Sequence, residues 1–400
     1  MIKIRRHEFP TGALPQVLKV LERRLNGELE DLKENAEWFS MALSSATTAL
    51  DRRCSGDPKA DKLETWVACV TAMQIGHALF VSARATSPTV TCQVGHDEHV
   101  FRSGAGPWAH AGNWLTAFWL SCVCRDRQRT DDLCQVPVSL LREAGGFDEY
   151  IYSWAEALQA YWLKQPELGD KLLAAVDGTD PEVLRPASRS AVLNLMYPPM
   201  NLLTQVVRGD QDRFTTELAK TVEWHKDYWT RDEELERDSD GLIALGPLAV
   251  ACLALDSGFT VEVESEYLPK YLLDGGWVGE FPTSSTRCPS TVQPTNRTRM
   301  TPGAPPTTPD EAIAIVRARY AQPKLPDGTP AELRVHEFDI GYLVYAAFPP
   351  RTDAAGRPEP APPGGAKILV SKETGETVTV PNYPPEQAIA LYRKNLEHNA

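Results

Sequence analysis

Residues 18–50 read LKVLERRLNGELEDLKENAEWFSMALSSATTAL, and this stretch decides the fold class. Apolar side chains recur along it at steps of three and four residues, at Leu18, Leu21, Leu25, Leu29, Leu32, Ala36, Phe39, Leu43, Ala46 and Leu50. Because an α-helix repeats every 3.6 residues, this spacing predicts a single apolar stripe along one or two helices. The stripe has to be covered by partner helices from elsewhere in the chain.

Six further stretches with helical spacing can supply those partners. They lie at 63–73, 114–123, 151–162, 191–207, 214–229 and 242–255, and Pro198 and Pro199 interrupt the fourth of them. Glycine pairs and Asp-Gly steps separate the stretches, as at Gly145-Gly146, and are typical of helix ends. We therefore predict a mainly α fold, an irregular array of helical hairpins, over residues 1–283. A fixed 34-residue repeat is not convincing, which leaves a regular solenoid as the weaker alternative.

The composition changes after residue 283. All ten tryptophans lie at or before Trp277, and residues 284–309 are rich in Ser, Thr and Pro, which predicts a linker. Beyond it, residues 310–400 favour a small α+β domain. Its expected elements are a helix at 310–321, strands at 333–338 and 342–348, a hairpin of 368–371 with 377–380, a loop at 349–365 and a closing helix at 384–396.

The net charge of −13 is concentrated in the first part of the chain. Residues 1–283 hold 42 acidic and 28 basic side chains, whereas residues 300–400 hold 12 and 10. Binding of phosphate draws on clustered Lys and Arg, so this balance argues against nucleic acid or an anionic membrane as the direct partner. A basic protein would suit the acidic part. No pattern in the sequence specifies an oligomeric state.

The N-terminus and the cysteines both bear on localisation. Arg5, Arg6, His7 and Glu8 occupy the place where a secretory signal needs an apolar core, and the apolar stretch 242–255 is too short to cross a bilayer. Of the eight cysteines, Cys69, Cys122 and Cys252 lie within apolar helical patterns, which favours reduced, buried thiols. We expect a cytoplasmic protein with no membrane span.

Motifs of catalysis are absent from the sequence: no phosphate-binding glycine loop, dinucleotide fingerprint, nucleophile elbow or zinc-protease helix occurs. Cys92, His96 and His99 have the side chains of a zinc site, but a fourth ligand is missing, and a polar loop is the more ordinary interpretation. Cys122 and Cys124 diverge on a helix and are expected to pack. We expect no catalytic residue, metal or cofactor.

Three acidic stretches are candidates for binding a partner. The first mixes acids with aromatic side chains, a composition typical of interfaces, and the second holds six acids against two arginines. In the third, glutamates alternate with Val and Ser, so an extended segment would place them on one face. We expect these side chains at the surface, with a solvated loop or a catalytic carboxylate pair as alternatives for the last two. The candidates are Asp148, Glu149, Tyr152, Asp232, Glu233, Glu234, Glu236, Glu262, Glu264 and Glu266.

Several separate blocks resemble one family, the immunity 49 family. They are Glu64-Thr65-Trp66 with VTAMQ at 70–74, NWLTAFW at 113–119, FDEYIY at 147–152, EWHK at 223–226, LGPLA at 245–249 and GWVGEFPT at 276–283. The resemblance covers nearly all of residues 1–283. It implies a mainly helical, non-enzymatic immunity protein of a bacterial polymorphic toxin system, a class often encoded beside nuclease toxins.

The tail is similar, more loosely, to the immunity 35 or YrhB-type domain. The similarity lies in the helix at 310–320, GYLV at 341–344, LV at 369–370 and TGE at 374–376. Tyr342 stands near the position where that family usually has Trp. Met300 begins a stretch that reads like a protein start, so we hypothesise a fusion of two immunity genes.

These observations predict that the chain neutralises a cognate toxin, a nuclease, by direct binding. Two other classes of protein remain as alternatives. One is a helical scaffold that joins cellular proteins, and the other is a hydrolase that depends on a metal or on the Glu262–Glu266 carboxylates.

Overall fold

The fold comes from a computed structural model that forms two compact units. The first unit spans Met1–Trp277 and the second lies within residues 287–400. The structure describes residues 1–185, 188–278, 305–319, 331–347, 367–375 and 377–380, with 385, 389 and 393. The predicted loop at 349–365 falls outside these residues, as do most of the linker at 284–309 and most of the closing helix at 384–396.

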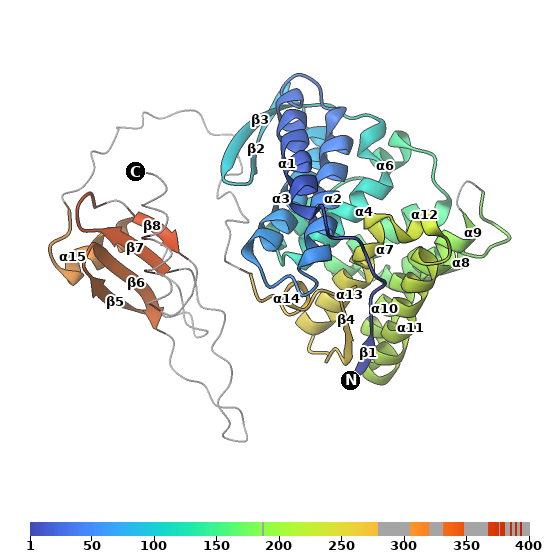
Figure 1. The fold of residues 1–400 in the computed structure, drawn as a ribbon. Helices are drawn as coiled ribbons and strands as arrows, with labels where there is room; N and C mark the ends of the chain where they lie inside the picture. The colour runs from blue at the N-terminus through green and yellow to red at the C-terminus, as the bar shows by residue number, and fades with distance from the viewer. Residues whose placement is uncertain are drawn as a thin grey trace. The chain divides into compact units, whose positions relative to one another are not determined.

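The opening apolar stripe forms two antiparallel helices, α1 (Leu14–Asp31) and α2 (Trp38–Gly56). The helices pack on each other, and α3 (Leu63–Arg84) packs beside α2 (Figure 1). The C-terminal half of the stripe is the part that reaches the core: Leu32, Phe39, Leu43 and Leu50 are buried. The helical prediction for this region is confirmed.

The remaining long helices extend the array. α4 (Ala111–Val123) packs between α3 and α13 (Leu245–Asp256), and α10 (Tyr197–Arg208) connects α13 to α11 (Gln211–Trp229). Two more, α7 (Glu149–Trp162) and α8 (Leu168–Asp177), pack on each other, α7 against α4 and α8 against α10. Short helices join them: α5 (Arg127–Cys134), α6 (Val138–Ala144), α9 (Arg189–Ala191), α12 (Glu233–Glu236) and α14 (Lys270–Leu273).

Two helical stretches are long and apolar enough to cross a membrane. They are Leu63–Arg84 and Ser239–Asp256, and 78% and 72% of their apolar windows are buried inside the unit. The burial shows that both serve as core helices of the first unit, as the sequence predicts for residues 242–255.

Two small sheets occur beside the helices of the first unit. β2 (Thr89–Val94) and β3 (Asp97–Arg102) form an antiparallel hairpin, with Gly95 at a φ of 64° in its turn. The interpretation of this stretch as a polar loop is therefore wrong. The other sheet joins the two ends of the unit, because β1 (Ile2–Ile4) pairs in parallel with β4 (Val263–Ser265).

The N-terminal segment after β1 is fastened to the helical array. The Arg6 guanidinium donates from Nη1 to the backbone carbonyl of Cys54, at 3.1 Å, and to that of Leu242, at 3.5 Å. His7 is buried and its Nδ1 lies 2.7 Å from the Tyr267 hydroxyl. Residues 1–9 are thus part of the folded unit.

The second unit is a small α+β domain, as predicted. A four-stranded antiparallel sheet has the order β5 (Glu332–Phe338), β6 (Gly341–Ala347), β7 (Lys367–Ser371) and β8 (Thr377–Val380). Helix α15 (Pro309–Arg319) packs on one face of the sheet. Their shared core contains Ala312, Val316, Tyr342, Val344 and Val370.

Candidate partner-binding surfaces

The first candidate stretch lies at the start of α7, and two of its three residues are interior. Asp148 is 8% exposed, and its carboxylate accepts a hydrogen bond from the Arg185 backbone N–H at 2.8 Å. Tyr152 is 4% exposed, and its hydroxyl donates to the Gly145 carbonyl. The expectation that these two side chains lie at the surface is wrong, because they fasten the preceding turn and the 185 segment to α7.

Glu149, the third residue of this stretch, is exposed. The guanidinium of Arg142 on α6 holds its carboxylate with both terminal nitrogens, one of them at 2.6 Å. This ion pair lowers the pKa of Glu149. The carboxylate therefore faces solvent with its charge already offset.

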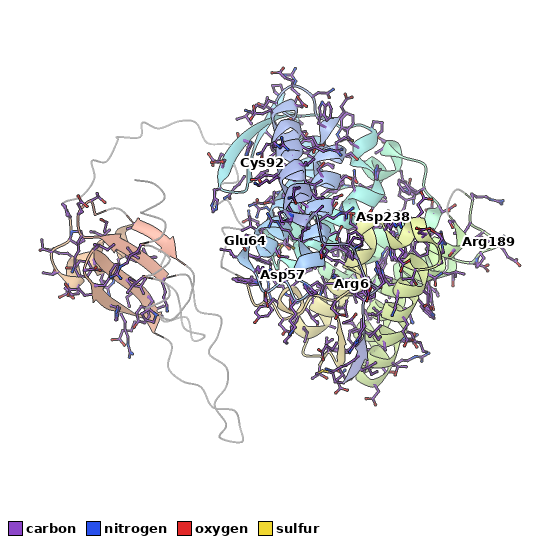
Figure 2. All side chains as sticks on the ribbon, viewed as in Figure 1. Arg6, Asp57, Glu64, Cys92, Arg189 and Asp238 are labelled. Carbon is purple, nitrogen blue, oxygen red and sulfur yellow. The ribbon has the colours of Figure 1, made fainter. Side chains whose placement is uncertain are left out.

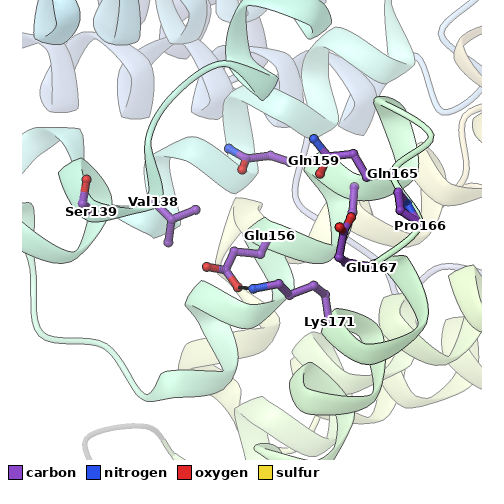
Figure 3. A pocket seen from close by; sticks show the side chains of 9 residues that line it. Val138, Ser139, Glu156, Gln159, Gln165, Pro166, Glu167 and Lys171 are labelled. Atoms are coloured by element: carbon purple, nitrogen blue, oxygen red, sulfur yellow. Dashed lines mark hydrogen bonds and ion pairs between the residues drawn. The ribbon is translucent and has the colours of Figure 1, made fainter.

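A shallow groove of about 650 Å³ follows the exposed side of α7, between α6 and α8 (Figure 3). Inside it, the Lys171 ammonium of α8 forms an ion pair with the Glu156 carboxylate of α7. The Gln159 amide donates to the Val136 carbonyl at 2.8 Å. The groove is polar and its central carboxylate is neutralised. Its lining includes the Ser139 hydroxyl but no histidine that could activate it, so its geometry suits contact better than catalysis.

The second stretch forms an acidic turn around α12, which we define as Asp232, Glu233, Glu234, Glu236, Asp238 and Asp240. All six side chains belong to exposed residues. Asp232 accepts a hydrogen bond from the Leu235 N–H at 2.9 Å and so caps α12. Arg237 pairs with Glu233 at 2.6 Å. Within the described part of the chain, Glu234 and Glu236 form no ion pair. The surface expectation is met for Asp232, Glu233, Glu234 and Glu236.

Asp51 of α2 adds a further carboxyl beside this turn. Burial raises the pKa of Asp51 well above its ordinary value, and the charges of Asp240 and Asp238 raise it further. Burial and Asp238 also raise the pKa of Asp240, while Arg52 acts in the opposite direction on both groups. Burial is the main cause of both shifts, and the neighbouring carboxylates add to it. A cation brought to this place would relieve the repulsion.

The third stretch is β4, where the predicted alternation is correct. Val263 and Ser265 are buried, whereas Glu262 and Glu264 are exposed and Glu266 is half-buried. Lys3 of β1 pairs with Glu264 at 2.9 Å, and the Arg6 backbone N–H donates to Glu266 at 3.0 Å. Pairing with β1 thus offsets the charge of Glu264, and a backbone donor holds Glu266. No carboxylate pair is arranged here as an acid and a base.

The structure brings the second and third stretches near each other, with the N-terminal segment between them. Arg6 contacts Glu266 of the third stretch. Burial lowers the pKa of the neighbouring His7, and the charge of Glu236 is close enough to oppose this shift. The charges of Arg6 and Asp238, both labelled in Figure 2, act on the same carboxyl, that of Asp51. No local pattern in the sequence indicates this juxtaposition.

A buried aromatic and histidine cluster lies beneath this region. His225 of α11 stacks edge-on to Tyr267, with ring centroids 4.9 Å apart, and its Nε2 lies 3.0 Å from the Gly241 carbonyl. Burial lowers the pKa of His225 to about 4, so the ring is neutral at pH 7. The cluster is closed to solvent and holds the 239–242 turn against α11.

The metal candidate falls on the hairpin. Cys92 of β2 lies opposite His99 of β3, and the His99 ring stacks on Phe101 at 5.5 Å. Burial raises the pKa of Cys92 to about 12, which disfavours the thiolate that zinc requires. In the described residues no group of three or more His, Cys, Asp or Glu side chains is placed to hold a metal ion. The seven described cysteines are all free thiols.

Comparison with known proteins gives two family matches. The model of the Immunity protein 49 family matches residues 57–272, and that of the Immunity protein 35-like domain matches residues 310–399. No curated protein and no solved structure matches the chain.

Proposed function

Since the chain belongs to the Immunity protein 49 family and carries an Immunity protein 35-like domain, it has an immunity role, and we propose that it neutralises a toxin by binding it directly. The toxin in this proposal is a basic nuclease domain of a polymorphic toxin system. Binding takes place in the cytoplasm and involves no turnover.

The acidic turn is the observation that carries this proposal. It presents six exposed acidic residues around one short helix on a chain with a net charge of −13, and Glu234 and Glu236 among them lack an ion pair within the described residues. A nuclease cleft is built to attract phosphate, so an acidic protein surface can occupy it in place of nucleic acid. Complementary fields of this kind raise association rates by about a hundredfold over neutral pairs.

The alternative functions receive less support from the geometry. A hydrolase would need an open site with an acid and a base, whereas Glu264 is paired with Lys3 and Glu266 is held by the Arg6 backbone N–H. A general scaffold would have no reason to concentrate negative charge in one turn. Because the chain carries two immunity domains, we propose that each unit binds a toxin of its own.

The proposal is tested in cells and with purified proteins. The full chain should restore growth to bacteria that express the toxin domain encoded by the adjacent gene. It should also co-elute with that domain in a fixed stoichiometry and inhibit the toxin in proportion to the complex formed. Protection without any complex, or measured turnover of a substrate by the purified chain, would contradict direct binding.

A further inference from the structure

A second groove lies between the end of α8 and the turn that precedes α10. Its volume is about 530 Å³. Val176, Leu193 and Tyr197 supply its apolar lining, and Asp177 and Asp180 supply carboxylates. Nearby apolar side chains are unusually open to solvent: Leu173 is 59% exposed and Leu193 is 42% exposed. Apolar surface gathered in this way, next to polar groups, is typical of an interaction site.

The backbone beside this groove is irregular for a reason found in the sequence. Residues Val192–Met196 form a π-helical turn, in which the Tyr197 N–H donates to the Val192 carbonyl five residues earlier. Pro198 and Pro199 follow, and proline has no N–H. The Asn194 carbonyl therefore loses both the donor of an α-helix and the donor of a π-helix. Turns of this type occur frequently at functional sites.

The groove adjoins the acidic turn. Arg231, which immediately precedes the turn, donates from Nη1 to the Ser190 hydroxyl at 2.9 Å, and Ser190 lies one helical turn before Leu193. Asp177 and Asp180 are exposed and form no ion pair with any residue that the structure describes. Arg189, the first residue of α9, carries a positive charge next to Ser190 (Figure 2). The result is an apolar hollow flanked by carboxylates.

We propose that this groove and the acidic turn together form the docking surface for a basic toxin. An apolar side chain of the toxin enters between Val176, Leu193 and Tyr197. Neighbouring Lys or Arg side chains of the toxin form ion pairs with the Asp177 and Asp180 carboxylates. The apolar anchor supplies the contact that resists dissociation, and the carboxylates around it select a cationic partner. The assignment rests on the proposed function and names the surface that performs it.

The test measures binding of the full chain to the toxin domain encoded by the adjacent gene, inactivated by a substitution in its active site. Leu193→Arg should weaken the affinity by at least about tenfold, because it fills the groove and repels a cationic partner. Val100→Arg, on the exposed side of β3, is the matched control: Val100 is 52% exposed, and its variant should bind like the wild type. Circular dichroism and thermal melting establish that both variants fold.

Hydrogen exchange on the unmutated chain gives a second readout. Residues 189–197 and 232–240 should gain protection in the complex. Should the wild-type chain not bind the toxin at all, both the proposed function and this assignment fail. A second outcome is that the wild type binds while Leu193→Arg binds as tightly as Val100→Arg, or that residues 189–197 gain no protection. Either result overturns the proposed docking surface but leaves the proposed function standing.

Discussion

Gly76 of α3 lies directly against Ala117 of α4: a Cβ atom at position 76 would stand 2.9 Å from the Ala117 Cβ and 3.1 Å from its Cα. Real side chains do not approach so closely. The contact therefore depends on the missing side chain of Gly76, which lets two central helices of the first unit meet at backbone distance.

Gly76→Val should destabilise the protein by about 1–3 kcal/mol, because the added methyl groups force α3 and α4 apart in a packed core. Urea unfolding followed by tryptophan fluorescence measures the effect. Gly27→Ala is the matched control, since Gly27 is helical and no atom lies within 4 Å of the place that its Cβ would occupy. That change should be neutral or stabilise by about 0.5–1 kcal/mol. Equal effects of the two substitutions would contradict the close approach.

Arg6→Ala should cost about 2 kcal/mol of stability, because it removes a charged donor from the carbonyls of Cys54 and Leu242 and leaves both acceptors without it. Arg5→Ala, at an exposed neighbouring position, should have little effect. The melting temperatures of the two variants, measured side by side, test whether the Arg6 side chain stabilises the fold. If both melt like the wild type, the N-terminal segment is not fastened as described.

Stability should fall on acidification from about pH 6.5 to about pH 4. Burial lowers the pKa of His225 to about 4 in the folded protein, whereas an unfolded chain takes up the proton near pH 6.5. Between these values the unfolded state binds more protons, so the free energy of unfolding decreases as the pH falls, by up to about 3 kcal/mol from this residue. The pKa of His7 is lowered too and acts in the same sense. His225→Gln should flatten the dependence in urea titrations at pH 7 and pH 5.

Asp51 should work against this loss. Its raised pKa means that the folded protein holds the proton to a higher pH than the unfolded chain, so acidification stabilises the folded state through this group. Asp51→Asn should therefore steepen the fall in stability between pH 7 and pH 5. An unchanged pH profile would show that burial and the nearby carboxylates do not raise the pKa of Asp51.

Association with the toxin should be steered by the acidic turn. Glu234→Lys combined with Glu236→Lys should lower the association rate constant by about tenfold at low salt, with a smaller change in the dissociation rate. Glu22→Lys combined with Glu37→Lys makes the same change in net charge at exposed positions on α1 and just before α2. Stopped-flow measurements at two ionic strengths compare the pairs. Equal slowing by both would assign the effect to net charge alone.

The helical array follows from the sequence because each long helix carries its own apolar period. The same kind of local signal predicts the sheet of the second unit, where β-branched and aromatic residues cluster. The pairing of β1 with β4 cannot be predicted in this way, since three-residue strands separated by the whole unit leave no local pattern. The hairpin of β2 and β3 could have been predicted from the sequence, because Val90, Cys92 and Val94 alternate with polar residues before Gly95. The polar residues at 96–99, however, favour a loop.

The site is harder to predict than the fold. Composition identifies acids and aromatics but does not say which face of a helix they occupy, so Asp148 and Tyr152 are expected outside and lie inside. The acidic turn is predictable because its charges are contiguous. The groove at Leu193 cannot be predicted from composition. The sequence does show Pro198-Pro199 within a helical pattern, which indicates disturbed backbone hydrogen bonding.

The first unit begins well before the part of the chain that the family match covers. The match starts at residue 57, but α1 and α2 precede it, and α2 covers α3, whose apolar window is 78% buried. Residues 1–283 expressed alone should therefore fold cooperatively, whereas residues 57–283 should aggregate or lack a cooperative transition, because they expose the α3 face that α2 covers. Residues 300–400 should fold separately if two genes have fused. A cooperative melt of the 57–283 fragment, or aggregation of 300–400, would contradict this division of the chain.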